Sequence, residues 1–359
     1  MKRVKNTIGL AAALVATLTA CTATPPERTP ETERLLGELR TVHQKGIMFG
    51  HHDDTMYGIG WEGDEGRSDV RSVCGDYPAV VSFDLGELEL GGTESLDKVA
   101  FDKIRKEIIN QYERGGIASI SWHARNPLTG GDAWDVSDST VVRSILPGGT
   151  NHAKFGGWLA RVADFIGSLR TAEGVKVPVL FRPWHEHTGS WFWWGEKLCS
   201  PDEYKALWRM TADSLRARGV DNVLYAYSPG AEPRDTTQYL ARYPGDDLIS
   251  VVGFDTYQFD RDEYLANMER MLRLTTDVAR AHDKVAAVTE TGYEGVPDAR
   301  WWTGTLLPAV AKYPVAYVLV WRNARERPTH FYAPYPGQVS AEDFVEFYND
   351  PRTLFAGDI

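Results

Sequence analysis

The sequence is poor in basic residues and in cysteine. It has 39 lysines and arginines against 50 aspartates and glutamates, which gives a formal net charge of −11 at pH 7. The first 20 residues carry three of the basic residues and no acidic one, so the rest of the chain is more negative still. Phosphate backbones and anionic membrane surfaces repel such a chain, and we expect no nucleic-acid partner.

Several catalytic fingerprints are absent. No GxSxG segment provides the nucleophile elbow of a serine hydrolase, and no HExxH or paired-cysteine pattern marks a metal site. Possible ligands do cluster at His51–Asp54 and His185–His187. Adjacent strand residues point to opposite faces, however, so His51 and His52 are poorly placed to share one ion. We therefore expect no metal and no cofactor, with metal catalysis as the main chemical alternative.

Residues 1–20 are typical of an export signal. They begin with basic residues, continue with an apolar stretch from Ile8 to Leu18, and end in small residues before Cys21. The tetrad Leu18–Cys21 resembles a bacterial lipobox, in which cleavage precedes the cysteine and lipid is attached to it. We expect a lipoprotein signal peptide at 1–20 and a lipid anchor at Cys21 in the cell envelope, facing the periplasm rather than the cell surface. A plain secretory signal is the alternative.

Residues 21–34 are rich in proline, threonine and charge, which predicts an extended tether. No comparable linker or close repeat follows, so residues 35–359 are predicted to form a single domain. Cys74 and Cys199 are the two cysteines that remain after Cys21. In an exported protein they could form a disulfide or stay as two free thiols.

Eight short apolar segments recur along this domain, and most are separated by segments of helical period. The segments start at Gly46, Tyr77, Gly116, Val177, Asn222, Leu248, Val285 and Val315. Helices are predicted at Asp97–Arg114, at Arg261–His282, and after a capping box at Ser200–Glu203. The alternation predicts an α/β fold of the (β/α)8 TIM-barrel type. An open doubly wound sheet is the alternative, but no strand end carries GxGxxG.

Polar and aromatic residues end the strands, and in a barrel these ends meet at one face. The residues expected there are His51, Asp53, Asp84, Glu87, His123, Arg125, Glu186, Asp255, Tyr257, Glu290, Trp321 and Arg322. The segment from Val177 to Trp194 adds Trp184, Trp191, Trp193 and Trp194 around Glu186. Aromatic faces beside an acid favour a sugar site. The alternative is that these tryptophans are core residues and Glu186 is a surface carboxylate.

Glycoside hydrolysis needs two carboxyl groups, and Glu186 and Glu290 end the fourth and seventh strands, across the predicted barrel mouth. Aromatic neighbours would raise the pKa of Glu186, while Arg182 or Tyr257 would favour an ionised Glu290. The rival carboxylates are Asp84, Glu87, Asp255 and Glu294.

The sequences RPWHEHTGSWFWWG, from Arg182, and TETG, at Thr289–Gly292, resemble glycoside hydrolase family 26, which consists mainly of β-1,4-mannanases. The resemblance covers nearly all of the chain after about residue 35. It implies a barrel with Glu186 as the acid/base and Glu290 as the nucleophile of a retaining mechanism. The implied substrate-binding residues are His123, His185, Trp191, Tyr257, Trp321 and Arg322, with His185 contacting the sugar before the cleaved bond, Tyr257 holding the nucleophile and Trp321 stacking on sugar. Alternatively, His123 and His185 only position other groups, and Trp321 only caps the core.

We therefore expect a monomeric, retaining β-1,4-mannan hydrolase that acts on mannan or manno-oligosaccharides. The long loop from Thr55 to Arg71 carries Trp61 and could close one end of a cleft, so an exo-acting mannobiohydrolase is an alternative. A glucanase or xylanase with the same glutamates is a further alternative. A noncatalytic sugar-binding lipoprotein would not need both carboxylates.

Overall fold

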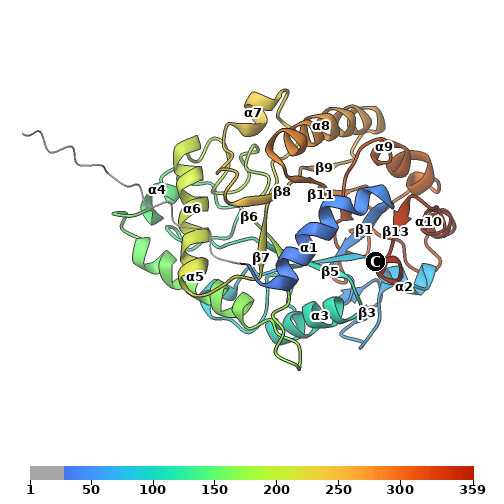
Figure 1. The fold of residues 1–359 in the computed structure, drawn as a ribbon, viewed down its shortest axis with the longest axis horizontal. Coiled ribbons are helices and arrows are strands. Elements are labelled where there is room, and N and C mark those ends of the chain that lie inside the picture. The colour runs from blue at the N-terminus through green and yellow to red at the C-terminus, as the bar shows by residue number, and fades with distance from the viewer. Residues whose placement is uncertain (1–27) are drawn as a thin grey trace, which may run out of the picture.

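The computed structural model describes residues 28–359, so the predicted signal peptide, Cys21 and most of the tether lie outside the described residues. Parallel strands form a closed barrel around the centre of the molecule (Figure 1). They are β1 (Ile47–His52), β4 (Val80–Asp84), β5 (Ile117–Trp122), β6 (Val179–Pro183), β7 (Val223–Tyr227), β8 (Ile249–Val252) with β9 (Asp255–Tyr257), β10 (Val285–Ala286) with β11 (Val288–Gly292), and β12 (Tyr317–Val320). Each of the eight predicted apolar segments supplies one side of this barrel.

Closure of the barrel depends on two interrupted strands. β8 pairs with β7 and β10, whereas β9, which follows after Gly253 and Phe254, pairs with β11. β11 pairs with β12, β12 with β1, and β1 with β4, which completes the ring. A Cβ atom added at Gly253 would lie 2.4 Å from Cγ2 of Thr289, so glycine permits the close approach at this break. The predicted (β/α)8 barrel is confirmed.

Helices surround the barrel in the expected alternation (Figure 1). The α-helices are α1 (Pro30–Thr41), α2 (Asp69–Cys74), α3 (Phe101–Glu113), α4 (Val141–Ile145), α5 (His152–Gly167), α6 (Pro201–Ala217), α7 (Thr236–Leu240), α8 (Arg261–His282), α9 (Leu307–Val310) and α10 (Ala341–Tyr348). Outside the barrel ring, β2 (Tyr57–Gly58) pairs with β3 (Trp61–Glu62), and β13 (Thr353–Leu354) pairs with β1. Short helical turns cover Val42–Gln44, Leu88–Leu90, Trp302–Leu306 and Ala356–Asp358. No helix among these described residues is both long and apolar enough to cross a membrane.

Two of the predicted helices have the expected ends. The capping box at α6 is confirmed, because Ser200 accepts from the Glu203 amide and Glu203 accepts from the Ser200 amide. The helix predicted at Arg261–His282 is α8. The helix predicted from Asp97 begins later, at Phe101, because Glu94 and Ala100 form a bridge that holds the intervening residues in a turn.

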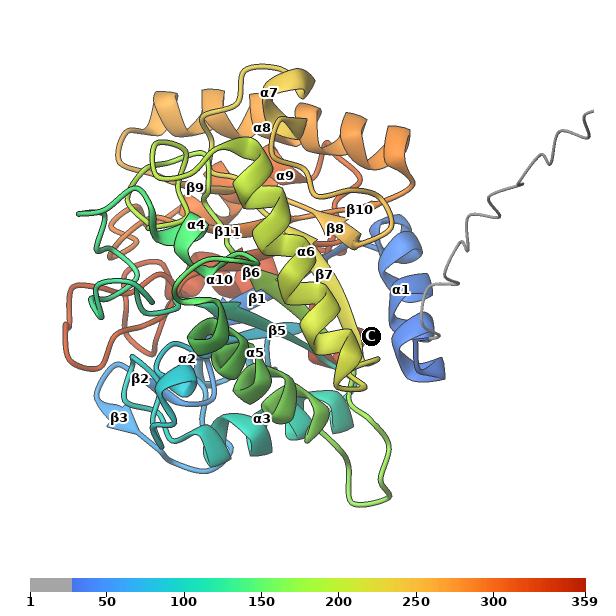
Figure 2. The ribbon, with the colours of Figure 1, turned by 90° about the vertical axis from the view of Figure 1, so that its left-hand side faces the viewer.

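Helix α1 closes the end of the barrel opposite the polar strand ends. Its Leu35, Leu36 and Leu39 are buried in one cluster with barrel-lining residues that include Leu180 and Leu319. Figure 2 shows α1 and the C-terminus at one end of the barrel, and the β2–β3 hairpin at the other. Because α1 begins at Pro30, after the capping residue Thr29, helical structure is present before the predicted domain start at residue 35.

The two described cysteines are free thiols, so the disulfide alternative is not realised in this structure. Cys74 ends α2, and Cys199 is buried next to the guanidinium of Arg242, 3.4 Å away. Burial raises the pKa of Cys74 to about 12 and also raises that of Cys199. Both thiols are therefore protonated near neutral pH and are poor nucleophiles.

Candidate active site

The tryptophans around Glu186 divide into core residues and one exposed residue. Trp184, Trp193 and Trp194 are fully buried, whereas Trp191 is 42% exposed. The expectation that all four offer faces to a sugar is therefore wrong for three of them, because their rings pack together in the aromatic core. The exposed Trp191 ring lies against Gly189. A Cβ atom at this position would come within 2.2 Å of the ring, so glycine permits the close approach.

The buried tryptophans hold the turn that carries Glu186. Both Trp184 and Glu186 have positive φ angles, of 55° and 52°, which residues other than glycine rarely adopt. The turn is held by three hydrogen bonds: the Glu186 amide donates to the Ser228 carbonyl at 2.7 Å, Trp194 Nε1 donates to the His185 carbonyl at 2.8 Å, and the Tyr204 hydroxyl donates to the Trp184 carbonyl at 2.7 Å. These bonds fix where the Glu186 carboxyl group points.

The Glu290 carboxylate on β11 is held from two sides. Arg182 Nη2 donates to one oxygen, and the Tyr257 hydroxyl donates to the other. Arg182 comes from β6, two residues after inward-facing Leu180, so strand alternation points it into the barrel. Its other terminal nitrogen, Nη1, donates to Asp255 at 2.7 Å. The structure thus brings Tyr257 and Glu290 together as predicted.

The electrostatic surroundings favour the neutral acid form of Glu186. Burial raises the pKa of Glu186 well above its usual range, and the negative charges of Glu290 and Asp255 add to the rise. Among the described residues, the carboxyl group of Glu186 accepts one hydrogen bond, from Trp191 Nε1 to Oε2, at 2.7 Å. Burial and the charge of Glu290 also raise the pKa of Tyr257, so its hydroxyl keeps the proton that it donates. A protonated Glu186 can assist a leaving group while ionised Glu290 attacks.

His123 and His185 form a chain of hydrogen bonds that starts at Asp84. Asp84 lies 2.7 Å from His123 Nδ1, and Nε2 of His123 lies 3.2 Å from Nε2 of His185. Burial lowers the pKa of a histidine, but the charge of Asp84 reverses this for His123 and raises its pKa. Burial, together with the nearby positive charge of Arg182, lowers the pKa of His185. These opposite directions favour His123 as the donor and His185 as the acceptor in the hydrogen bond between them.

Trp321 is partly exposed and lies on the same side of the site as the two histidines. The His52 ring stacks on it with centroids 3.9 Å apart, and the His123 ring lies edge-on at 6.0 Å. On the outer side, exposed Trp134 stacks on His123 with centroids 5.2 Å apart. Sequence reasoning missed Trp134, which lies in the loop after β5 rather than at a strand end.

Arg322 is engaged with protein groups. Its Nη2 lies 3.1 Å from Asp97 and 2.8 Å from Glu326, and its Nη1 donates to the Tyr57 hydroxyl at 3.3 Å. The loop from Thr55 to Arg71 is also tied down, because buried Trp61 donates to Asp69 at 2.7 Å and Asn323 donates to the same carboxylate at 2.9 Å. Trp61 therefore packs into the protein instead of lining an open cleft.

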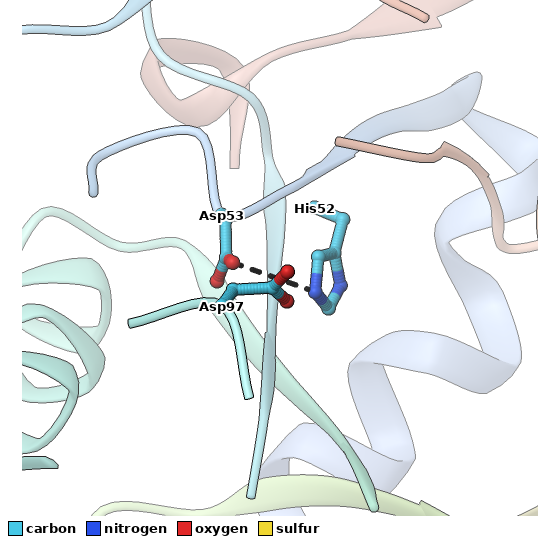
Figure 3. Close-up of side chains that lie close together, drawn as sticks. All are labelled: His52, Asp53 and Asp97. Atoms are coloured by element: carbon cyan, nitrogen blue, oxygen red, sulfur yellow. Dashed lines mark ion pairs between the residues drawn. The ribbon is translucent and has the colours of Figure 1, made fainter. Parts of the chain in front are cut away.

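His52, Asp53 and Asp97 are the possible metal ligands in the described chain (Figure 3). They offer three donor atoms within 4.8 Å of one another, and both His52 nitrogens lack a hydrogen-bond partner among the described residues. Asp53 turns back toward His52 because it follows β1 with a φ angle of 54°. A cation fits poorly, however, because Arg322 already places a permanent positive charge beside Asp97 and the Tyr57 hydroxyl donates to Asp53 at 2.6 Å.

Each rival carboxylate has a basic partner. Asp84 binds His123, Asp255 binds Arg182, Glu87 lies 3.3 Å from Arg125, and Glu294 lies 2.7 Å from His330. Asp84 and Asp255 therefore position His123 and Arg182 rather than act on substrate. Glu186 differs from all four because, within residues 28–359, its carboxyl group has no cationic side chain among its hydrogen-bond partners.

The chain is similar in sequence to known proteins. A sequence model described as glycosyl hydrolase family 26 matches residues 24–327. Among curated relatives, a mannan endo-1,4-β-mannosidase from Bifidobacterium adolescentis is 33% identical over 354 residues, covering 91% of this chain but only 35% of that protein. A mannan endo-1,4-β-mannosidase from Bacillus subtilis is 28% identical, covering 76% of this chain and 73% of that protein. This chain thus spans about a third of the first relative's length.

Solved structures give the same result. A family 26 β-mannanase from Bacteroides ovatus is 64% identical, with a TM-score of 0.92, and the match covers 92% of this chain and 96% of that one. A modular endo-β-1,4-mannanase from Cellulomonas fimi is 36% identical, with a TM-score of 0.85, over 93% of this chain and 77% of that one. With a family match over most of its length and paired glutamates at the barrel mouth, this chain belongs to glycosyl hydrolase family 26 and is a glycoside hydrolase.

Proposed function

We propose that this enzyme hydrolyses β-1,4-mannosidic bonds within mannan chains with retention of anomeric configuration. The observation that carries the proposal is the contrast between the raised pKa of Glu186 and the placement of Glu290 between Arg182 and Tyr257. The names of the relatives above support mannan as the polymer and internal bonds as the point of attack.

The proposed reaction has two displacements. In the first, a Glu290 oxygen attacks the anomeric carbon as the glycosidic bond breaks, and Glu186 donates its proton to the leaving sugar oxygen. In the second, Glu186 removes a proton from water, and the resulting nucleophile breaks the bond to Glu290. Arg182 and Tyr257 hold Glu290 in position for the first attack, and Trp321 supplies an aromatic face for a sugar.

Product analysis on linear mannan, glucan and xylan tests this proposal. We expect a ladder of manno-oligosaccharides at early times and no products from the other two polymers. A single short product from mannan would overturn internal cutting. Products from glucan or xylan in place of mannan would overturn the polymer assignment, and no products from any polymer would favour a noncatalytic sugar-binding protein.

We also propose that Cys21 carries a lipid that anchors the enzyme to the cell envelope, on the periplasmic side. The proposal is supported by the Leu-Thr-Ala-Cys tetrad after the apolar segment of residues 8–18. A Cys21→Ser variant should move from the membrane fraction to the soluble fraction of the cell envelope. A variant that remains with membranes would contradict lipid attachment at this residue.

A further inference from the structure

Phe259 is the most exposed large apolar side chain in the described part of the chain, at 90%. Within residues 28–359, only three aromatic side chains are exposed: Trp134, Trp191 and Phe259. Trp134 stacks on His123 and Trp191 donates to Glu186, so both belong to the active site. A single exposed apolar side chain is common on protein surfaces, but Phe259 lies beside the same site, in a lining that includes Glu186, and this position indicates a binding role.

Phe259 and Trp191 line one cavity of about 470 Å³ that opens onto Glu186. This volume lies within the range of about 300–1,000 Å³ that is typical of ligand sites. The lining includes Glu186 but not Glu290, His123, His185 or Trp321. Tyr257, which donates to Glu290, also lines the cavity, whereas Trp321 does not. Because Glu186 protonates the leaving group, a cavity on its side and away from Trp321 faces the leaving part of the substrate.

The backbone around Phe259 is fixed. The Gln258 amide donates to the Gly292 carbonyl at 2.8 Å, and the Gln258 side chain accepts from Trp301 Nε1 at 2.8 Å. Asp260 caps α8 by accepting from the Glu263 amide at 3.0 Å. The Phe259 ring is thus presented from a rigid segment, as a stacking platform requires.

The polar lining suits a neutral sugar. Asn267 already accepts from Arg270 at 2.8 Å through its oxygen, which leaves its amide group free to donate to a hydroxyl. Glu232, Asp260 and Glu263 add carboxylates, and no lysine or arginine is among the described residues that line the cavity. Carboxylates accept hydrogen bonds from sugar hydroxyls but repel uronic acids.

We propose that the cavity between Trp191 and Phe259 binds the leaving-group side of an uncharged mannan chain. In this proposal Phe259 stacks on the second leaving-group sugar, counted from the cleaved bond. The inference rests on the proposed function. It also gives the cavity a second role. A bound acceptor sugar can replace water, so that its hydroxyl oxygen bonds to the anomeric carbon, the bond to Glu290 breaks, and Glu186 takes the hydroxyl proton.

The test compares mannohexaose with 4-nitrophenyl β-mannobioside, whose leaving group does not reach a second sugar position. For Phe259→Ala, kcat/KM on mannohexaose should fall about three- to tenfold, the order expected for one lost aromatic contact. Transglycosylation relative to hydrolysis should fall by a similar factor, while kcat/KM on the aryl substrate stays within about twofold of the unmodified enzyme. Phe259→Trp should retain all three values.

Two further variants distinguish the role of this cavity from that of Trp321 and from the general effect of truncating an exposed side chain. Trp321→Ala should lose activity on both substrates, whereas Val339→Ala, which truncates an exposed side chain outside the cavity lining, should change neither. Phe259→Ala values equal to the unmodified enzyme on both substrates, or an equal loss on both, would overturn this inference alone. Failure of the unmodified enzyme on both substrates would overturn the proposed function and this inference with it.

Discussion

Glu186 and Glu290 are both carboxylic acids at the barrel mouth, but they have different supports. Glu290 lies within β11, is 5% exposed, and accepts hydrogen bonds from Arg182 and Tyr257. Glu186 lies on a turn after β6 and accepts one hydrogen bond, from partly exposed Trp191. The first arrangement holds a nucleophile in a fixed position, and the second allows a carboxyl group to hold and release a proton. The surroundings therefore assign the two roles.

Removal of Glu290 should have the largest effect. Glu290→Ala has no nucleophile for the covalent intermediate, so kcat/KM should fall by at least about 10⁴-fold on mannan and on 4-nitrophenyl β-mannobioside alike. Steady-state kinetics on both substrates provide the measurement, with thermal unfolding as the check on folding. Substantial activity on the aryl substrate would remove the contrast between the two glutamates.

Removal of Glu186 should lower activity on mannan much more than the first turnover of the aryl substrate. For Glu186→Ala, mannan hydrolysis should fall by about 10²–10⁴-fold, the usual contribution of a general acid. Because nitrophenolate leaves without a proton, release of the first equivalent from the aryl substrate should remain fast and be followed by slow turnover. Stopped-flow absorbance detects that burst, and its absence together with equal losses on both substrates would contradict the acid/base role.

Tyr257→Phe should have an intermediate effect. The change removes one of the two donors to Glu290 and leaves Arg182 in place. A hydrogen bond to a charged group contributes about 1.5–3 kcal/mol, so kcat/KM should fall about 10- to 100-fold on both substrates. The matched control is Tyr313→Phe, because the Tyr313 hydroxyl also donates to a carboxylate, that of Glu269 at 2.7 Å, but lies outside the cavity lining. Equal effects of the two changes would indicate that Tyr257 acts only in packing.

The smallest effect concerns pH. The Trp191 hydrogen bond favours the ionised form of Glu186, so Trp191→Phe should raise the pKa of Glu186 further. Glu186 must be protonated to donate, and mannan activity is lost as pH rises through this pKa. The alkaline limb of kcat/KM on mannan should therefore move to higher pH in the variant. A shift to lower pH would show that Trp191 favours the neutral acid.

The sequence predicted most of the barrel because burial on both faces leaves a strong pattern. All eight strand segments, α8 and the capping box of α6 follow from apolar runs and local capping rules. The breaks in the sixth and seventh strands were not predicted. They depend on contact between Gly253 and Thr289, which are far apart along the chain.

The candidate site was predicted where residues end strands and missed where loops supply them. Glu186, Glu290 and Tyr257 stand at strand ends and meet as expected. Trp134 and Phe259 lie in loops, whose paths no local pattern determines. The core role of Trp184 was also unpredictable, because a tryptophan beside an acid has the same sequence signal whether it faces substrate or packs inward.

The most direct test of the account is the anomeric configuration of the product that Glu186→Ala forms from 4-nitrophenyl β-mannobioside in the presence of azide. Azide needs no general base, so it should occupy the space left by Glu186 and attack the intermediate on Glu290. The account predicts a β-configured glycosyl azide by NMR, together with an α-configured azide for any rescue of Glu290→Ala by direct displacement. The opposite pair of products would exchange the roles of the two glutamates, and inversion by the unmodified enzyme would contradict the two-step mechanism.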